Sequence, residues 1–200
     1  SFIVKEGVFL GYEQQVGSRS SNFGLTGCIT FHDIKLVSLK VSIEQSMCED
    51  AVHFVRAHGN VENITVNNSA SDAIDADFSD LRFVKLDVSN AGNDCVDFSA
   101  GVYRVDDMAL HNCGDKGISA GEGSVVSLRN GKINQAMIGL VAKDGSNVSV
   151  NEVKLIDVNV CLGAYSKKQE YEGGWLKINK IDCSSNKYFS QTGSRIDILK

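Results

Sequence analysis

Carboxylates recur at a fixed interval along the middle of this chain. Asp72 and Asp94 are 22 residues apart, and so are Asp75 and Asp97. If this interval places each pair on neighbouring strands of a sheet, the strands lie about 4.8 Å apart and the carboxylates stack. Like charges that close destabilise a cross-strand pair unless a cation bridges them or one is protonated. The four aspartates are therefore candidate catalytic acids and bases, or ligands of a metal ion.

Calcium is the metal that would suit such a ladder, because calcium takes oxygen ligands in proteins. Asp75, Asp77 and Asp97 are the candidate ligands. The acid/base alternative requires no cofactor.

Basic and aromatic side chains near the same positions are candidates for contact with a substrate. His53 precedes Asp75 by 22 residues, so a carboxylate could orient it as a general base. Lysine and tyrosine side chains could bind or polarise an acidic sugar. The candidate substrate-binding residues are His53, Lys116, Lys143 and Tyr165.

These acids also have structural explanations, which the sequence leaves open. Asp50, Asp72 and Asp94 form a column in a turn, where an aspartate commonly accepts hydrogen bonds from nearby backbone N–H groups. Lys116 follows Asp94 by 22 residues and could offset the stacked charge. Aspartates on a solvent-facing strand could serve solubility alone.

The elements that would position these side chains are predicted by a 22-residue repeat. Apolar residues fill two columns at this interval, and the second column lies two positions after the first. Alternate residues of a strand share a face, so both columns are expected to point inward from one strand. The columns are Val52, Ile74, Val96, Ile118, Leu140 and Leu162, and Phe54, Ala76, Phe98, Ala120, Ala142 and Ala164.

The rest of each repeat also indicates short strands joined by turns. Pairs such as Ile64 and Val66 predict a second strand in each coil. Asn68, Asn90, Asn112 and Asn134 predict a stacked turn, because asparagine tolerates the left-handed conformation and its amides can bond to one another. Proline is absent, and neither a helical stripe nor a leucine-rich-repeat pattern recurs. We predict an all-β, single-stranded, right-handed parallel β-helix with about 22 residues per coil.

The repeat divides the chain into a start and one solenoid. Residues 1–26 are expected to form an irregular coil or cap over the apolar end. Residues 27–200 are expected to form the parallel β-helix, with a one-residue slip near residues 42–47. The register breaks at residues 166–175, which predicts a projecting loop.

Residues between the inward positions are expected to face solvent. One of these columns contains only small side chains and predicts the floor of a shallow groove: Ala51, Ala73, Cys95, Gly117, Gly139 and Cys161. The two columns beside it carry the titratable groups: His53, Asp75, Asp97, Ser119, Val141 and Gly163, then Val55, Asp77, Ser99, Gly121, Lys143 and Tyr165.

Composition excludes several classes of function. A net charge of −5 with scattered Lys and Arg residues argues against a nucleic-acid partner. No apolar run is long enough to span a membrane. The six cysteines lack zinc-site spacing and are expected to be buried free thiols. Cys161 and Cys183, 22 residues apart, are the one candidate disulfide pair, if they stack on adjacent coils.

The segments around the acids resemble the motifs of polygalacturonases, a family of pectin-lyase-like β-helices. That family carries N-T-D, D-D, G-H-G and R-I-K motifs, and four segments here fall in the same order: residues 70–75, 93–97, 114–119 and 141–143. The resemblance implies that Asp72 and Asp94 match catalytic carboxylates. It implies that Lys143 matches a contact to the substrate carboxylate.

The chain departs from those motifs at three positions. Asn93, Lys116 and Val141 stand where the family has Asp, His and Arg. Inverting hydrolysis needs one carboxyl to protonate the leaving oxygen and a second to activate water. Asp72 and Asp94 could supply these groups, but a polygalacturonase activity is not expected without the other three residues.

Two hypotheses for function follow. In the first, the protein binds an acidic or neutral polysaccharide or cleaves it as a hydrolase or lyase. In the second, it is a non-catalytic secreted or surface module. The fold cannot choose between them. A secreted or surface location is implied by the resemblance alone, and the exposed ends of a solenoid also allow oligomers.

Overall fold

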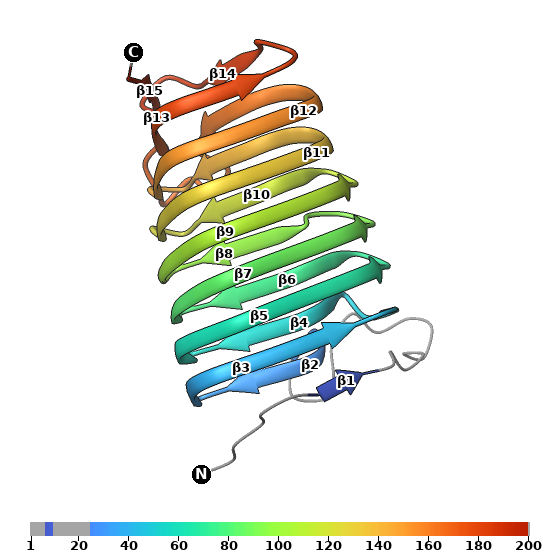
Figure 1. Cartoon of the computed structure of the whole chain (residues 1–200). Helices are drawn as coiled ribbons and strands as arrows, with labels where there is room; N and C mark the ends of the chain where they lie inside the picture. The colour runs from blue at the N-terminus through green and yellow to red at the C-terminus, as the bar shows by residue number, and fades with distance from the viewer. Residues whose placement is uncertain (1–6, 10–24, 200) are drawn as a thin grey trace.

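The computed structural model describes residues 7–9 and 25–199, and these residues form a parallel β-helix (Figure 1). Figure 1 shows the strands stacked as successive coils along one axis, from β1 at one end to β15 at the other. All printed strand pairs are parallel. The described part of the chain contains no helix, and hence none that could cross a membrane. The predicted all-β parallel β-helix is confirmed.

Two series of strands alternate along the chain. The β4–β10 face consists of β2 (Gly27–His32), β4 (Asp50–Val55), β6 (Asp72–Asp77), β8 (Val96–Ser99), β10 (Lys116–Gly121) and β14 (Tyr188–Ser190). The β5–β13 face consists of β1 (Gly7–Phe9), β3 (Lys35–Ile43), β5 (His58–Ser69), β7 (Asp80–Ala91), β9 (Val102–Cys113), β13 (Trp175–Cys183) and β15 (Arg195–Ile198). The long strands β11 (Val125–Lys143) and β12 (Asn147–Tyr165) contribute to both faces.

The register follows the 22-residue interval through the middle of the solenoid. Ile74 pairs with Val96, Val96 with Ile118, and Ile118 with Leu140. Both apolar columns that were predicted to face inward are buried in every coil. The apolar pairs of the second strand, such as Ile64 and Val66, are buried as well. The periodicity therefore identified the core correctly.

Aromatic rings fill the wider part of this core and stack from coil to coil. The ring centroids of Phe31 and Phe54 are 5.2 Å apart, and Phe83 continues the stack at 5.8 Å from Phe54. Tyr103 ends it, 4.3 Å from Phe98. The Tyr103 hydroxyl lies 2.7 Å from the carbonyl oxygen of Ala76 and 2.8 Å from that of Ser99. These contacts satisfy a polar group that burial would otherwise leave unpaired.

The asparagine ladder is confirmed for three of its four members. Asn90 donates to the side-chain oxygen of Asn68 at 3.0 Å, and Asn112 donates to that of Asn90 at 3.0 Å. All three have the left-handed backbone, with φ of 59°, 60° and 56°. Asn134 pairs in register with His111 instead, and Gln135 takes the positive φ. An additional residue between β9 and β11 shifts the register there, so the prediction for Asn134 was wrong.

The cysteines form three disulfides, so the expectation of free thiols was wrong. Each disulfide joins the beginning of a coil to its end, with Cα atoms 5.3 to 6.2 Å apart. The bonds are Cys28–Cys48, Cys95–Cys113 and Cys161–Cys183. Cys161 and Cys183 are bonded, but they close one coil and do not stack on neighbouring coils. Their separation of 22 residues includes the insertion between β12 and β13.

The column of small residues faces the core and not solvent, which corrects a second prediction. Ala51, Ala73 and Cys95 are fully buried. A Cβ atom added to Gly117 would lie 2.5 Å from Cδ1 of Ile133, and one added to Gly139 would lie 2.9 Å from Cδ1 of Leu155. Small side chains are needed here because the bend leaves no space. The column is therefore not the floor of an outward groove.

The insertion lies where the register predicted a break. Residues 166–174 contain no strand, and they are attached to the preceding coil by Asp144. The buried carboxylate of Asp144 accepts hydrogen bonds from the backbone N–H of Lys167 at 2.6 Å and of Lys168 at 2.8 Å. These bonds hold the start of the loop against the β-helix.

The first coil differs from the prediction in one detail. The register shifts lie between Leu36 and Lys40, and not near residues 42–47. Of the predicted cap at residues 1–26, Gly7–Phe9 form β1, which pairs with β3, and residues 25–26 precede β2. The rest of that prediction lies outside the described residues.

We expect that replacing Cys95 and Cys113 together by alanine lowers the free energy of unfolding by about 3 kcal/mol, because the cross-link restricts the unfolded chain. Guanidinium unfolding of the oxidised proteins measures the difference. The wild-type protein in reductant is the control and should be destabilised at least as much as the variant. Equal unfolding free energies of variant and oxidised wild type would contradict the structural role of this disulfide.

Candidate functional site

The β4–β10 face brings the predicted site residues together. His53, Asp75, Asp97 and Ser119 are in register on β4, β6, β8 and β10. Asp77 lies on β6, two residues after Asp75. The spacing of 22 residues therefore placed these side chains on adjacent strands, as the stacking argument required.

Asp72 and Asp94 cap the backbone of the next coil. Oδ1 of Asp72 accepts hydrogen bonds from the backbone N–H of Asp94 at 2.8 Å and from Nδ2 of Asn93 at 2.7 Å. Oδ1 of Asp94 accepts from the backbone N–H of Lys116 at 3.0 Å. Burial raises the pKa of Asp94 to about 6, although Lys116 opposes this shift. Burial also raises the pKa of Asp72. The turn-capping explanation of this column therefore has direct support.

Lys116 neutralises part of this acidic turn. Its Nζ lies 3.3 Å from Oδ1 of Asp94 and also contacts the carboxylate of Asp115. Burial alone would lower the pKa of Lys116, but the two carboxylates outweigh it and raise the pKa. Tyr165 lies in the same electrostatic environment, and burial raises its pKa. The ammonium group of Lys116 is therefore engaged within the protein.

Lys143 reaches back across a coil towards Asp97. Its side chain lies over Gly121, where an added Cβ atom would be 2.7 Å from Cε of Lys143. Nζ of Lys143 ends 3.6 Å from Oδ2 of Asp97. Burial raises the pKa of Asp97 and Lys143 opposes the shift. Oδ1 of Asp97 is buried and meets no hydrogen-bond donor in good geometry among the described residues. This carboxylate and amine form the pair on this face best arranged for proton transfer.

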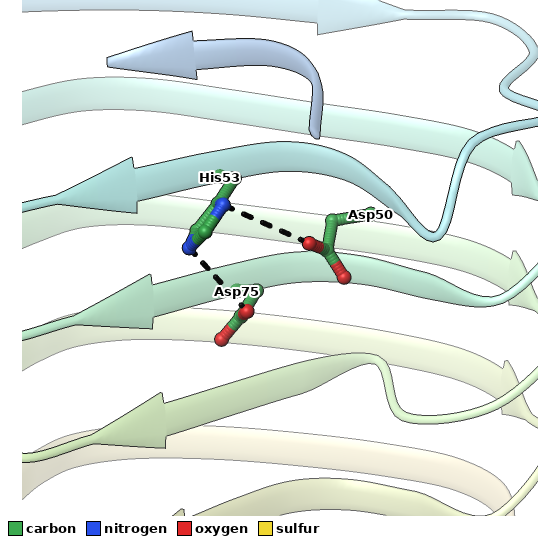
Figure 2. Close-up of side chains that lie close together, drawn as sticks. All are labelled: Asp50, His53 and Asp75. Atoms are coloured by element: carbon green, nitrogen blue, oxygen red, sulfur yellow. Dashed lines mark ion pairs between the residues drawn. The ribbon is translucent and has the colours of Figure 1, made fainter. Parts of the chain in front are cut away.

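His53 lies in a second cluster at the other end of the ladder. Figure 2 shows its ring between the carboxylates of Asp50 and Asp75. Nε2 lies 3.6 Å from Oδ2 of Asp75 and 3.0 Å from Oδ2 of Asp77, while Nδ1 lies 3.9 Å from Oδ2 of Asp50 and 2.9 Å from Oγ1 of Thr26. One ligand atom each of Asp50, His53 and Asp75 lies within 4.8 Å of the other two. This group could hold a metal ion.

The acids of this cluster are buried close to one another. Burial raises the pKa of Asp50 to about 6. Burial raises the pKa of Asp75 well above its ordinary value, and the charges of Asp50, Asp77 and Asp97 add to the shift. Asp50 was assigned to the turn column alone and was missed as a candidate ligand. The signal that could have identified it is the spacing Asp50-x-x-His53 at the start of a strand.

The calcium assignment to Asp75, Asp77 and Asp97 stays a prediction. Asp77 contacts His53, and Asp97 contacts Lys143, so each of these two acids has a nitrogen neighbour. The two columns expected to face solvent are also less open than predicted. His53, Ser119, Val141, Val55, Ser99 and Lys143 are all buried.

A groove that the sequence analysis missed lies on the β5–β13 face. Four of its residues are in register on consecutive strands: Arg104 on β9, Ser127 on β11, Ser149 on β12 and Lys177 on β13. The groove has a volume of about 460 Å³ and is lined by Arg104, Val105, Asp106, Ser127, Leu128, Arg129, Ser149, Val150, Asn151, Lys177 and Asn179. The two serines leave a low floor between two cationic ends.

Trp175 lies beside this groove on the same side of β13 as Lys177. A smaller adjoining hollow is lined by Trp175 together with Asn147, Val148, Ser149 and Lys177. The indole is 41% exposed, and its Nε1 donates to Oδ2 of Asp197 at 3.0 Å. The guanidinium of Arg195 lies 5.3 Å from the ring centroid. These contacts fix an exposed aromatic ring next to polar and basic groups. The column of Arg82, Arg104, Ser127, Ser149 and Lys177 was the available sequence signal.

Comparisons with protein-family models, with curated proteins and with solved structures find no match to this chain. The likeness to polygalacturonases therefore rests on the short motifs around the acids. The fold and the two surfaces define a parallel β-helix with an acid-rich face and a basic groove.

We expect stability to depend on pH through Asp94. Because its pKa is raised from 3.8 to about 6, its stabilising contribution is fully present below about pH 4 and is lost as pH rises through about 6. The free energy of unfolding of Asp94→Asn, relative to wild type, should rise by about 3 kcal/mol between pH 4 and pH 7. Urea unfolding at several pH values measures this.

Asp157→Asn is the matched control, because Asp157 is exposed and its φ of 51° suits asparagine. The control should show no such relative change with pH. A parallel pH dependence of wild type and Asp94→Asn would show that Asp94 is not the responsible carboxyl.

Proposed function

We propose that the protein binds an acidic polysaccharide along the groove of the β5–β13 face. The observation that carries the proposal is the row Arg104, Ser127, Ser149 and Lys177 on four consecutive strands. The outer members of the row are about 14 Å apart, since neighbouring strands are separated by about 4.8 Å. An extended chain laid along the solenoid axis could contact both cationic ends and rest on the serines between them.

The charge of the groove supports an anionic ligand. Its lining contains Arg104, Arg129 and Lys177 but only one acid, Asp106. Arg104 and Arg129 also pair with acids outside the lining, at 2.8 Å to Asp80 and 3.0 Å to Asp107. Exposed ion pairs contribute only about 0 to 1 kcal/mol each, so these guanidinium groups can turn towards a ligand carboxylate at little cost. Arginine is also suited to planar, bidentate recognition of carboxylates.

Polar and aromatic side chains in and beside the groove support a sugar as the ligand. Ser127, Ser149 and Asn151 offer hydroxyl and amide groups to sugar hydroxyls. Trp175 presents an apolar ring surface next to them. Binding sites for small polar molecules combine apolar and aromatic surface with a few placed polar groups, and this surface has both.

We expect polygalacturonate or alginate to bind more tightly than dextran, and binding to weaken as salt rises, because Debye screening reduces attraction between exposed charges. The Arg104→Ser/Lys177→Ser variant should bind the acidic polymer at least about tenfold more weakly, equivalent to about 1.4 kcal/mol. Isothermal titration calorimetry measures these affinities.

Lys40→Ser is the control, since Lys40 is an exposed lysine on β3, outside the groove. Its affinity should equal that of the wild type. Equal binding of dextran and polygalacturonate, or an unchanged affinity of the double variant, would refute the groove assignment.

Cleavage of the polysaccharide is a second candidate function, and the Asp97–Lys143 pair favours it. An amine 3.6 Å from a carboxyl with one free buried oxygen is an arrangement that could exchange a proton with substrate. Asp72 and Asp94 are less suited to this role, because their oxygen atoms cap the backbone. Asp75 and Asp97 stay the candidate catalytic acids of the face, with Lys143 and Tyr165 beside them.

We expect a panel of acidic polysaccharides to show new reducing ends or the absorbance of unsaturated uronates if this second function is correct. Asp97→Asn and Lys143→Met should each lower the rate at least about 100-fold, the usual contribution of a positioned acid or base. Asp157→Asn should leave the rate unchanged. Cleavage that survives both substitutions would place the chemistry elsewhere, and no cleavage of any polymer would leave binding as the function.

A further inference from the structure

A buried carboxylate oxygen in the His53 cluster has no hydrogen-bond partner. Asp50 is only 2% exposed, and its Oδ2 makes no hydrogen bond within the described part of the chain. Figure 2 shows this carboxylate directed at the ring of His53, with Oδ2 at 3.9 Å from Nδ1. Burying an unpaired carboxylate oxygen is costly unless a cation or a donor compensates. The missing partner points to a bound cation.

The positions of the ligand atoms are close to those of a metal site. Bonds of about 2.0 to 2.2 Å in a tetrahedral site put neighbouring ligand atoms about 3.4 Å apart. The contacts of His53 with Asp75 and Asp50 measure 3.6 and 3.9 Å, and all three ligand atoms lie within 4.8 Å of one another. Small rotations of these side chains would bring the atoms to bonding distance of one ion.

The ligand types select the metal. One imidazole nitrogen with carboxylate oxygens suits divalent first-row transition metals such as zinc, cobalt or manganese. Calcium prefers six to eight oxygen ligands and does not use imidazole nitrogen. The histidine therefore separates this site from the oxygen-only set of Asp75, Asp77 and Asp97.

The surroundings of His53 also fit a metal ligand. A metal ion takes one ring nitrogen, and the second nitrogen of a metal-bound histidine normally donates to a fixed oxygen. Oγ1 of Thr26 lies 2.9 Å from Nδ1, and Oδ2 of Asp77 lies 3.0 Å from Nε2. Whichever nitrogen binds the ion, the other keeps a hydrogen-bond partner. β4 and β6 hold these groups on adjacent strands of a rigid sheet.

From these observations we propose that Asp50, His53 and Asp75 bind a divalent transition-metal ion. The site lies on the β4–β10 face, away from the polysaccharide groove, and does not depend on it. It offers three protein ligands, so a zinc or cobalt ion there would retain a position for a water molecule or a further ligand. Asp77 lies close enough to His53 to serve as the partner that orients the ring.

The test is a titration of the metal-stripped protein. After treatment with EDTA and dialysis, the chain is titrated with Co²⁺ by calorimetry and visible absorption, then with Zn²⁺ as a competitor and with Ca²⁺ separately. We expect one Co²⁺ per chain, displacement by Zn²⁺, and weaker binding of Ca²⁺. Asp50→Asn and His53→Gln should each lower the Co²⁺ affinity at least about tenfold, the effect known for disturbed metal sites.

Two further variants keep the test decisive. His58→Gln, at an exposed histidine on β5, should leave Co²⁺ binding unchanged. Asp75→Asn replaces either variant that fails to fold, as judged by circular dichroism, and should show the same loss of affinity. The proposal is overturned if the wild type binds no Co²⁺, if ligand-site variants bind as the wild type does, or if Ca²⁺ binds more tightly than Zn²⁺.

Discussion

Parallel stacking in register is the constraint on which the rest of this structure depends. Because strands such as β6 and β8 are parallel and offset by one period, each side chain lies directly beside the residue 22 positions away. A column gains or loses stability according to what it repeats. Asparagines repeat favourably, because one amide donates to the next. Phenylalanines repeat favourably as stacked rings. Aspartates do not, and the β4–β10 face is organised around that difficulty.

The protein handles its stacked acids in different ways along the ladder. In the turn, the carboxylates of Asp72 and Asp94 take backbone donors from the next coil. In the strand, basic residues intervene: His53 lies below Asp75, and Lys143 reaches Asp97 over Gly121. Burial keeps part of the charge protonated by raising the pKa of these acids. Asp50 alone keeps a buried oxygen without a hydrogen bond among the described residues of the ladder turn, and this is where the metal site is proposed.

Periodicity predicted the core well because burial is what the repeat encodes. The column from Val52 to Leu162 and the turn from Asn68 to Asn112 needed only the interval of 22. Orientation near a bend was not predictable in this way, since alternation fails where the backbone turns, and Ala73 and Gly117 therefore point inward. The disulfide of Cys95 and Cys113 crosses one coil, so it leaves no trace at the period.

The candidate site was predicted in part, for the same reason. The register placed His53, Asp75 and Asp97 side by side, but sequence could not show that Asp50 turns towards them or that Lys143 spans a coil. The basic groove was missed because only one face was considered.

The insertion between β12 and β13 shows how tolerant this architecture is of added length. The coil closed by Cys161 and Cys183 carries the extra residues 166–174, and the pairing of β12 with β13 resumes at Trp175 without disturbance. Lengthening a surface loop costs little free energy, because closure entropy grows slowly with length. This loop leads directly into the strand that carries Trp175 and Lys177. It is thus a natural position for sequence variation or for a grafted segment that would alter ligand preference while the solenoid stays intact.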